Sequence, residues 1–214
     1  MLLNKPLDYI LGQSSKIKIL RFLILSQAQL NGREIAKSVG LSHVKVHYAL
    51  KDLYRQGLVN LRSVGKSLIY WLNEEHFLVK NILRPIFEKE SGILNFLVQS
   101  ITKESGYPRP LSIILFGSFA KNTASPDSDI DVAIIYPNSK NKLLIDKELF
   151  KVEKKITILF GNRLAPIVLK IRDLQNKFKK NEKFIKEIVS TGKIIYGKSF
   201  SELINLNVKR YQNN

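Results

Sequence analysis

The segment from Leu111 to Tyr136, LSIILFGSFAKNTASPDSDIDVAIIY, constrains this chain more than any other stretch. One apolar strand runs into Gly117-Ser118, and the start of a second apolar strand carries Asp129 and Asp131. Residues two apart on a strand point to the same face, so the two carboxylates are expected to project together. Such a pair raises each partner's pKa unless a cation lies between them, and hard carboxylate oxygens suit Mg2+ or Mn2+. The segment therefore predicts a divalent metal site.

The Gly-Ser turn supplies the second half of this predicted site. Gly117 lets the backbone approach a ligand closely, and Ser118 offers an N–H and a hydroxyl at the start of a short helix, which suits phosphate. Phosphate beside a metal indicates a nucleotide. The alternative is that residues 125–129 form a turn whose acids bond only nearby backbone N–H groups. That interpretation accounts for Asp127 but not for Asp131, which lies inside the strand.

These residues resemble the nucleotidyltransferase superfamily, whose mark is Gly-Ser, a short spacer, and Asp-x-Asp on the next strand. The segment is most similar to the minimal nucleotidyltransferase branch, in which the spacer contains Phe-Ala-Arg-Gly and Ser-Asp-Ile-Asp follows. Lys121 and Asn122 stand where Arg-Gly is usual. The resemblance implies metal-binding and catalytic roles for Asp129 and Asp131. It also implies contacts to a nucleoside triphosphate, ATP in the first instance, from Gly117, Ser118, Lys121 and Ser128.

A third carboxylate is missing from the sequence pattern. Enzymes of the family that this segment resembles contribute a third carboxylate from a later strand, which completes the metal-binding site. The comparable strand here, from Arg163 to Ile171, has no acid, and Pro166 or a neighbour stands in its place. Asp173 follows only at the end of that strand, where we expect it to cap the next helix and not to bind metal. Whether the site catalyses transfer is therefore left open.

The N-terminal part has a different pattern. Helices are expected over 14–27 behind a serine cap, over 32–39 ending at Gly40, and over 43–56 between the cap Ser42 and Gly57. Two short strands, 58–64 and 67–73, follow around Gly65-Lys66. This layout is typical of a winged helix-turn-helix. Over about residues 12–74 it resembles the DNA-binding unit of small prokaryotic transcriptional regulators.

In that arrangement the third helix enters the major groove of double-stranded DNA and the wing touches phosphate or the minor groove. The predicted DNA contacts are Ser42, His43, Lys45, His47 and Tyr48 near the helix start, Lys51 and Arg55 toward phosphate, and Arg62 and Lys66 on the wing. The alternative is that Tyr48 and the two histidines are ordinary surface or half-buried residues. Few strong base-bonding side chains occur here, so specificity is expected to be modest or to need a dimer.

Composition limits the remaining choices. The chain has 35 Lys and Arg against 18 Asp and Glu, a formal net charge of +17. This charge favours binding of polyanions, and nucleic acid is the first candidate. The alternative is that a lysine-rich genome bias produces part of the charge without any function. Cysteine is absent, which excludes disulfides and thiolate zinc sites. No signal peptide or bilayer-spanning run is found, so we expect a soluble cytoplasmic protein without a membrane partner.

We expect a two-domain chain, a mostly helical winged helix-turn-helix followed by an α+β nucleotidyltransferase fold with helices on one side of its sheet. The predicted parts are residues 1–75, connecting helices over 76–105, and residues 106–214, with the linker at 106–110. The connecting helices are expected to be kinked or broken at Pro85, and a second break is expected at Ser91-Gly92. The connecting helices carry more apolar residues than one exposed helix needs. The resemblance to winged-helix regulators implies that this surface forms a homodimer, and packing on the next domain is the alternative.

Three functions follow as hypotheses. The first is a DNA-binding regulator whose second domain binds Mg-NTP without turnover. The second is an active nucleotidyltransferase that moves a nucleoside monophosphate onto a protein or small-molecule hydroxyl. The third, implied by the minimal branch, is an antitoxin-like partner of a small helical toxin.

Overall fold

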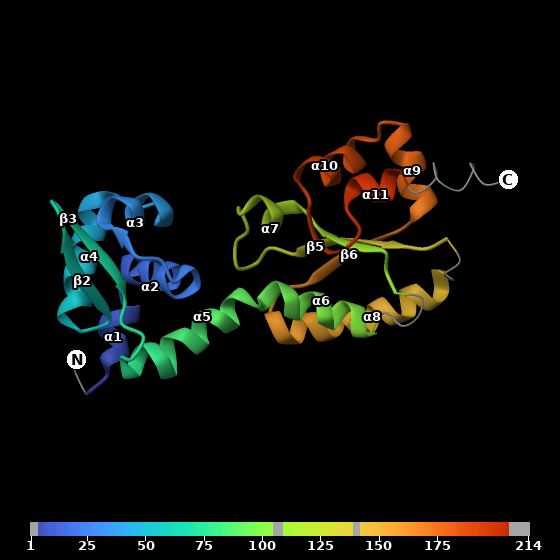
Figure 1. Cartoon of the computed structure of the whole chain (residues 1–214). Helices are drawn as coiled ribbons and strands as arrows, with labels where there is room; N and C mark the ends of the chain where they lie inside the picture. Colours follow the sequence, from blue (N-terminus) through green and yellow to red (C-terminus); the bar gives the residue numbers. More distant parts are fainter. Residues whose placement is uncertain (1–3, 105–108, 139–141, 206–214) are drawn as a thin grey trace. The chain divides into compact units, whose positions relative to one another are not determined.

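The computed structural model describes residues 4–104, 109–138 and 142–205, and the chain divides into two compact units, Met1–Gly92 and Ile93–Asn214 (Figure 1). We call them unit 1 and unit 2. Each unit has a hydrophobic core of its own. Part of the predicted linker, residues 106–108, lies outside the described residues.

Unit 1 is a winged helix-turn-helix, as the sequence predicted. Its elements are α1 (Pro6–Leu11), α2 (Ser14–Ser26), β1 (Leu30–Asn31), α3 (Gly32–Val39), α4 (His43–Arg55), β2 (Val59–Val64), β3 (Ser67–Leu72), the π-helical turn η1 (Val79–Leu83) and α5 (Arg84–Ser91). The wing is a three-stranded sheet in the order β1-β3-β2, with antiparallel pairing throughout. The short strand β1 was not expected from the sequence.

Local signals fix the two helices of the helix-turn-helix. The Asn31 side chain accepts hydrogen bonds from two N–H groups of α3, and the Glu34 carboxylate accepts one from the Asn31 N–H, which completes a capping box. Gly40 ends α3 in the left-handed conformation (φ 64°). The Ser42 hydroxyl accepts from the Lys45 N–H at 3.4 Å and starts α4, as predicted. The expected serine cap of α2 was wrong, because Ser14 is already the first helical residue and Gln13 precedes it without a side-chain cap.

The core of unit 1 contains one buried cation. Lys16 is 1% exposed, pairs with Asp52 of α4, and donates to the Tyr9 carbonyl at 2.8 Å. A buried ammonium is tolerated only when it is paired in this way. The contact ties α1 and α2 to α4, the helix that would face DNA.

The helices after the wing are divided between the units. Pro85 lies in the first turn of α5, directly after η1. The missing N–H of a proline is tolerated at this position, so Pro85 does not interrupt α5. Within unit 1, α5 packs on α2: Arg21 pairs with Glu90 at 2.6 Å and its guanidinium lies 5.4 Å from the Phe87 ring centre. The next helix, Ile93–Glu104, begins unit 2.

Unit 2 is built around a mixed four-stranded sheet in the order β6-β5-β4-β7, in which only β5 and β6 are parallel. Its elements are α6 (Ile93–Glu104), β4 (Ser112–Leu115), α7 (Gly117–Lys121), β5 (Ile130–Tyr136), α8 (Lys142–Phe160), β6 (Leu164–Lys170), α9 (Ile171–Lys179), α10 (Lys183–Thr191), β7 (Lys193–Gly197) and α11 (Phe200–Asn205). The α+β class is confirmed.

Helices cover both faces of this sheet, so the expectation of helices on one side was wrong (Figure 1). On one face Ile113, Val132 and Ile134 pack in the same core as residues of α6 and α8. On the other face Ile114 and Ala133 pack with residues of α9, α10 and α11. Because β4 and most of β5 are continuously apolar and do not alternate, both of their faces have to be buried. Among the described residues, no helix combines the length and apolar character needed to cross a bilayer.

Candidate nucleotide and metal site

The predicted glycine and the predicted acid of unit 2 lie in direct contact. Gly117 has φ +66°, which favours glycine, and a Cβ added there would overlap Asp131 Oδ2 and lie 3.0 Å from Asp131 Cγ. The sheet sets this contact, because Leu115 pairs with Val132 and the Phe116 N–H donates to the Asp131 carbonyl at 3.0 Å. The turn therefore places the Asp131 carboxylate over a residue that must lack a side chain.

Asp129 and Asp131 interact electrostatically at the start of β5. Asp129 is exposed just before the strand, whereas Asp131 is partly buried as its second residue. Burial first, and then the negative charge of Asp129, raises the pKa of the Asp131 carboxyl. A divalent cation held by both carboxylates would reverse this effect, because it stabilises the ionised form.

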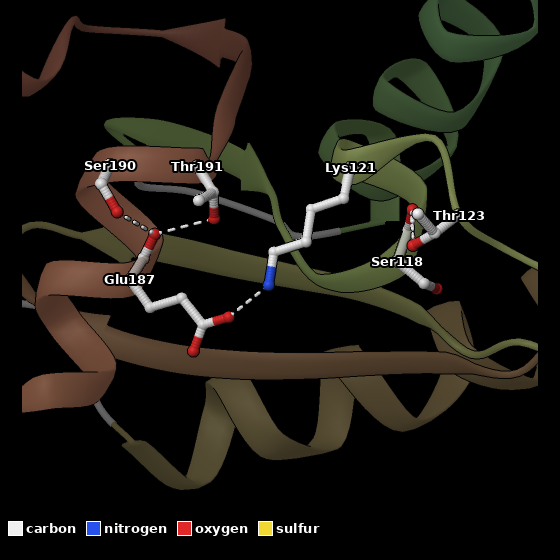
Figure 2. Close-up of polar contacts among 6 residues, drawn as sticks. All are labelled: Ser118, Lys121, Thr123, Glu187, Ser190 and Thr191. Carbon is white, nitrogen blue, oxygen red and sulfur yellow. Dashed lines mark hydrogen bonds and ion pairs between the residues drawn. The ribbon is translucent and has the colours of Figure 1, made fainter.

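Ser118 and Lys121 both lie on α7, but their polar groups have partners of different kinds (Figure 2). The Ser118 carbonyl accepts from the Thr123 N–H at 2.9 Å, which closes the end of the helix. The Lys121 ammonium forms an ion pair with Glu187 of α10 at 2.6 Å. Glu187 was not found from the sequence, because it belongs to no motif and is far from Lys121 in the chain.

Asn122 explains how the chain departs from the usual Arg-Gly pattern. It ends α7 in the left-handed conformation, with φ 57° and ψ 33°. Asparagine is one of the few residues besides glycine that adopt this region readily. The turn geometry is therefore kept although the glycine is not.

The loop between α7 and β5 is held by its own hydrogen bonds. The Ser128 hydroxyl accepts from the Ser125 N–H at 2.9 Å, and its carbonyl accepts from the Asn162 side chain at 3.0 Å. Asp127 is exposed in the same turn. The hydroxyl of Ser128, a predicted nucleotide contact, thus takes part in the turn that precedes Asp129.

The register of β5 and β6 identifies the residue in place of a third acid. Asp131 pairs with Ala165, and Pro166 pairs with Val132 on the opposite face. Asp173 lies exposed in the first turn of α9, beyond the end of β6 at Lys170, which is about 16 Å of strand away from Ala165. Lys170, not Asp173, occupies the N-cap, so that part of the expectation was wrong. Among the described residues, no group of three or more His, Cys, Asp or Glu side chains could hold a metal ion.

In unit 1 all nine predicted DNA contacts are exposed on α4, its cap and the wing: Ser42, His43, Lys45, His47, Tyr48, Lys51, Arg55, Arg62 and Lys66. The His47 ring contacts those of His43 and Tyr48, with centroid distances of 6.5 and 5.7 Å. Arg62 is held on the wing, 5.5 Å from the Trp71 ring centre and bonded to Gln29 at 3.1 Å.

A groove of about 480 Å³ lies between α4, the start of α3 and the wing. His43, His47 and Lys66 line it, and Arg33 joins them from α3. Arg33 was not predicted as a contact, since only the tertiary fold brings the start of α3 beside the wing.

The fold and the residues of unit 2 define a nucleotidyltransferase domain, joined to a winged helix-turn-helix of the regulator type. The polymerase beta nucleotidyltransferase family matches residues 99–201. A putative protein adenylyltransferase of Methanocaldococcus jannaschii is 34% identical over 106 residues, which is 47% of this chain and 71% of that protein. The chain therefore belongs to the nucleotidyltransferase family.

A second relative matches a shorter stretch of this chain. An uncharacterised HTH-type transcriptional regulator of M. jannaschii is 36% identical over 69 residues, which is 32% of this chain but 17% of that regulator. The chain thus spans less than a fifth of that relative.

Two solved structures show weaker likeness. A mutant of the MntA-HpeT toxin-antitoxin is 16% identical with a TM-score of 0.39, over 56% of this chain and 86% of that one. The antimony-specific transcriptional repressor AntR is 16% identical with a TM-score of 0.35, over 44% of this chain and 78% of that one. These likenesses are too weak to support a function.

Proposed function

We propose that this protein is a DNA-binding transcriptional regulator whose nucleotidyltransferase domain binds a magnesium-complexed nucleoside triphosphate, ATP first. The observation that carries the proposal is the contact between Gly117 and the Asp131 carboxylate, beside the second acid Asp129. A side-chain-free turn against an acid pair is the arrangement that a phosphate and a divalent cation need together.

The residues present fit one magnesium ion bound with a nucleotide. Mg2+ commonly takes one or two protein carboxylates and completes its shell with phosphate oxygens and water. Asp129 and Asp131 would hold it, and Ser118 would contact the phosphates. When bound, the ion supplies charge neutralisation to the phosphates. Lys121 would join them only by leaving Glu187, so we expect this lysine to contribute less than the acid pair.

The alanine at position 165 favours nucleotide binding without catalytic turnover. A two-metal clamp needs a further acid beside the pair, and the side chain paired with Asp131 is a methyl group. With only Asp129 and Asp131 to hold metal, the attacking hydroxyl of the acceptor has no further carboxylate to orient it or accept its proton. We therefore assign the site to nucleotide binding without rapid transfer.

Isothermal titration with MgATP tests the binding site. Wild type is expected to bind, and Asp131→Asn to lose binding by about a hundredfold because one of two metal ligands is gone. Asp127→Asn is the matched control, since it removes an exposed acid of the same loop. Equal affinities for wild type and Asp131→Asn would refute the site, and repeating the titration in EDTA tests the need for metal.

A second candidate function is transfer of a nucleoside monophosphate to a protein or small-molecule hydroxyl. The similarity to a putative protein adenylyltransferase favours it. In a balanced step, the acceptor oxygen bonds to the α-phosphorus, pyrophosphate leaves, and the hydroxyl proton passes to a base. Incubation with ATP labelled at the α-phosphate would show labelled acceptor that depends on Asp131, whereas binding without any label supports the regulator.

The exposed basic face of unit 1 supports the proposed DNA binding. Unit 1 carries 14 Lys and Arg against 7 Asp and Glu, a formal excess of seven positive charges. Mobility shifts on random-sequence duplex should lose affinity steeply as salt rises, because phosphate contacts release counterions. Lys51→Ala should weaken binding, whereas Lys89→Ala, on α5, should not. No retention of duplex at low salt would refute the assignment.

A further inference from the structure

We infer that Phe184 of α10 forms the surface on which the nucleobase stacks in the proposed nucleotide site. This inference rests on the proposed function and adds what recognises the base. It starts from the position of Phe116, which directly precedes Gly117. Because Phe116 lies opposite Asp131 across β4 and β5, the two side chains lie on the same face of the sheet.

Phe184 extends from that position toward solvent. Its ring contacts the Phe116 ring edge to face, with centroids 5.7 Å apart and planes at 83°. Phe116 is 8% exposed, whereas Phe184 is 41% exposed. A partly exposed aromatic ring therefore contacts Phe116, the residue that directly precedes the Gly117 turn.

The packing of α10 does not require this aromatic ring. Ile185 and Ile188 anchor the helix, since they are 1% and 0% exposed and belong to the core beneath it. A lone exposed Phe is common on protein surfaces and needs no explanation by itself. The ring is informative because it contacts Phe116, which directly precedes the Gly117 turn and shares a sheet face with Asp131.

The surroundings of Phe184 favour an anionic ligand with an aromatic part. Four lysines close to it in the sequence, at 179, 180, 183 and 186, are exposed, and Glu182 in the same segment is paired with Lys177 at 2.8 Å. Their field attracts a polyphosphate. Every base presents a π-face to an aromatic side chain, so the contact gives affinity for a nucleoside without choosing among the bases. The Ala165 and Ala133 side chains on the same sheet face add little bulk.

Comparing two ligands separates the base from the phosphates. Phe184→Leu keeps an apolar side chain in the contact with Phe116 but removes the ring. We expect it to weaken MgATP binding about tenfold and to leave magnesium tripolyphosphate binding unchanged. Phe184→Trp should keep MgATP affinity, and its indole fluorescence should change on adding MgATP but not on adding magnesium tripolyphosphate. Phe150→Leu, at an exposed Phe of α8 that is 68% exposed, is the matched control.

The outcomes distinguish this inference from the proposed function. If Phe184→Leu binds MgATP like wild type while Asp131→Asn does not bind, Phe184 is only a surface residue and the nucleotide site stands. If Phe184→Leu weakens both ligands equally, it acts through the fold of α7 and the inference fails. If wild type binds neither ligand, the nucleotide site and this inference fail together. Hydrogen exchange of α10 in each variant shows whether the helix is intact.

Discussion

The contact between Gly117 and Asp131 makes Gly117→Ala the sharpest perturbation of the site. An alanine there meets two separate penalties. The left-handed φ of +66° costs alanine about 1–2 kcal/mol. The new Cβ also overlaps Asp131 Oδ2, so the carboxylate must leave its rotamer at a further cost of about 0.5–1.5 kcal/mol.

Gly161 in the same unit separates the two penalties. It ends α8 with φ +75° and has no atom within 4 Å of an added Cβ. Gly161→Ala should therefore lower the free energy of unfolding by about 1–2 kcal/mol, and Gly117→Ala by about 1.5–3.5 kcal/mol. Only Gly117→Ala should also weaken MgATP, by about 10–100-fold, because the displaced carboxylate is a proposed metal ligand.

Native-state hydrogen exchange read by mass spectrometry reports the opening of unit 2 alone, and calorimetry reports MgATP binding. In an Asp131→Ala background, the added cost of Gly117→Ala over Gly161→Ala should shrink, because the oxygen that it meets has gone. If Gly117→Ala costs no more than Gly161→Ala and binds MgATP like wild type, the close approach of glycine to the acid is not the basis of the site.

Four further outcomes follow from the same geometry. Ala165→Asp should raise Mn2+ affinity about tenfold in calorimetry, because a third acid joins the pair, and unchanged affinity would refute the register. Glu187→Gln should release Lys121 and raise MgATP affinity by no more than about fivefold, since an exposed pair is worth at most about 1 kcal/mol; weaker binding would contradict this. The raised pKa of Asp131 favours its protonated form in the fold, so its contribution to the stability of unit 2 is greatest below the ordinary aspartate pKa of about 3.9 and is lost as pH rises through the raised value. Exchange rates followed upward from that pH should show this loss in wild type and not in Asp131→Asn. Lys66→Ala should reduce the slope of log affinity for duplex DNA against log salt by about one, and an unchanged slope would exclude this wing contact.

The sequence predicted elements well where local chemistry decides them. Gly40 and Ser42 mark the turn between α3 and α4 because each satisfies backbone groups within a few residues of itself. The Gly-Ser and Asp-x-Asp pattern likewise located α7 and the start of β5. The strand KIIYG was predicted and is β7.

What depends on tertiary packing was not predictable. Glu187 and Phe184 come from α10, which carries no motif, and only the folded sheet brings that helix beside α7. The identity of the residue opposite Asp131 depended on strand register, which a run of apolar residues does not specify. Arg33 was not predicted to line the groove beside α4 and the wing for the same reason. The second helical layer was not predicted from the sequence. The continuous apolar residues of β4 and β5 indicated strands, but they also require that both faces of these strands be buried.

The separate cores of the two units have a genetic consequence. Because the described residues of each hydrophobic core come from one unit alone, a lesion that unfolds unit 2 is expected to leave unit 1 able to fold. With the DNA binding proposed for unit 1, such a damaged copy would compete with the intact one for the same DNA sites in a cell carrying both alleles. Mutations that unfold unit 2 are therefore expected to be dominant, and mutations that unfold unit 1 recessive.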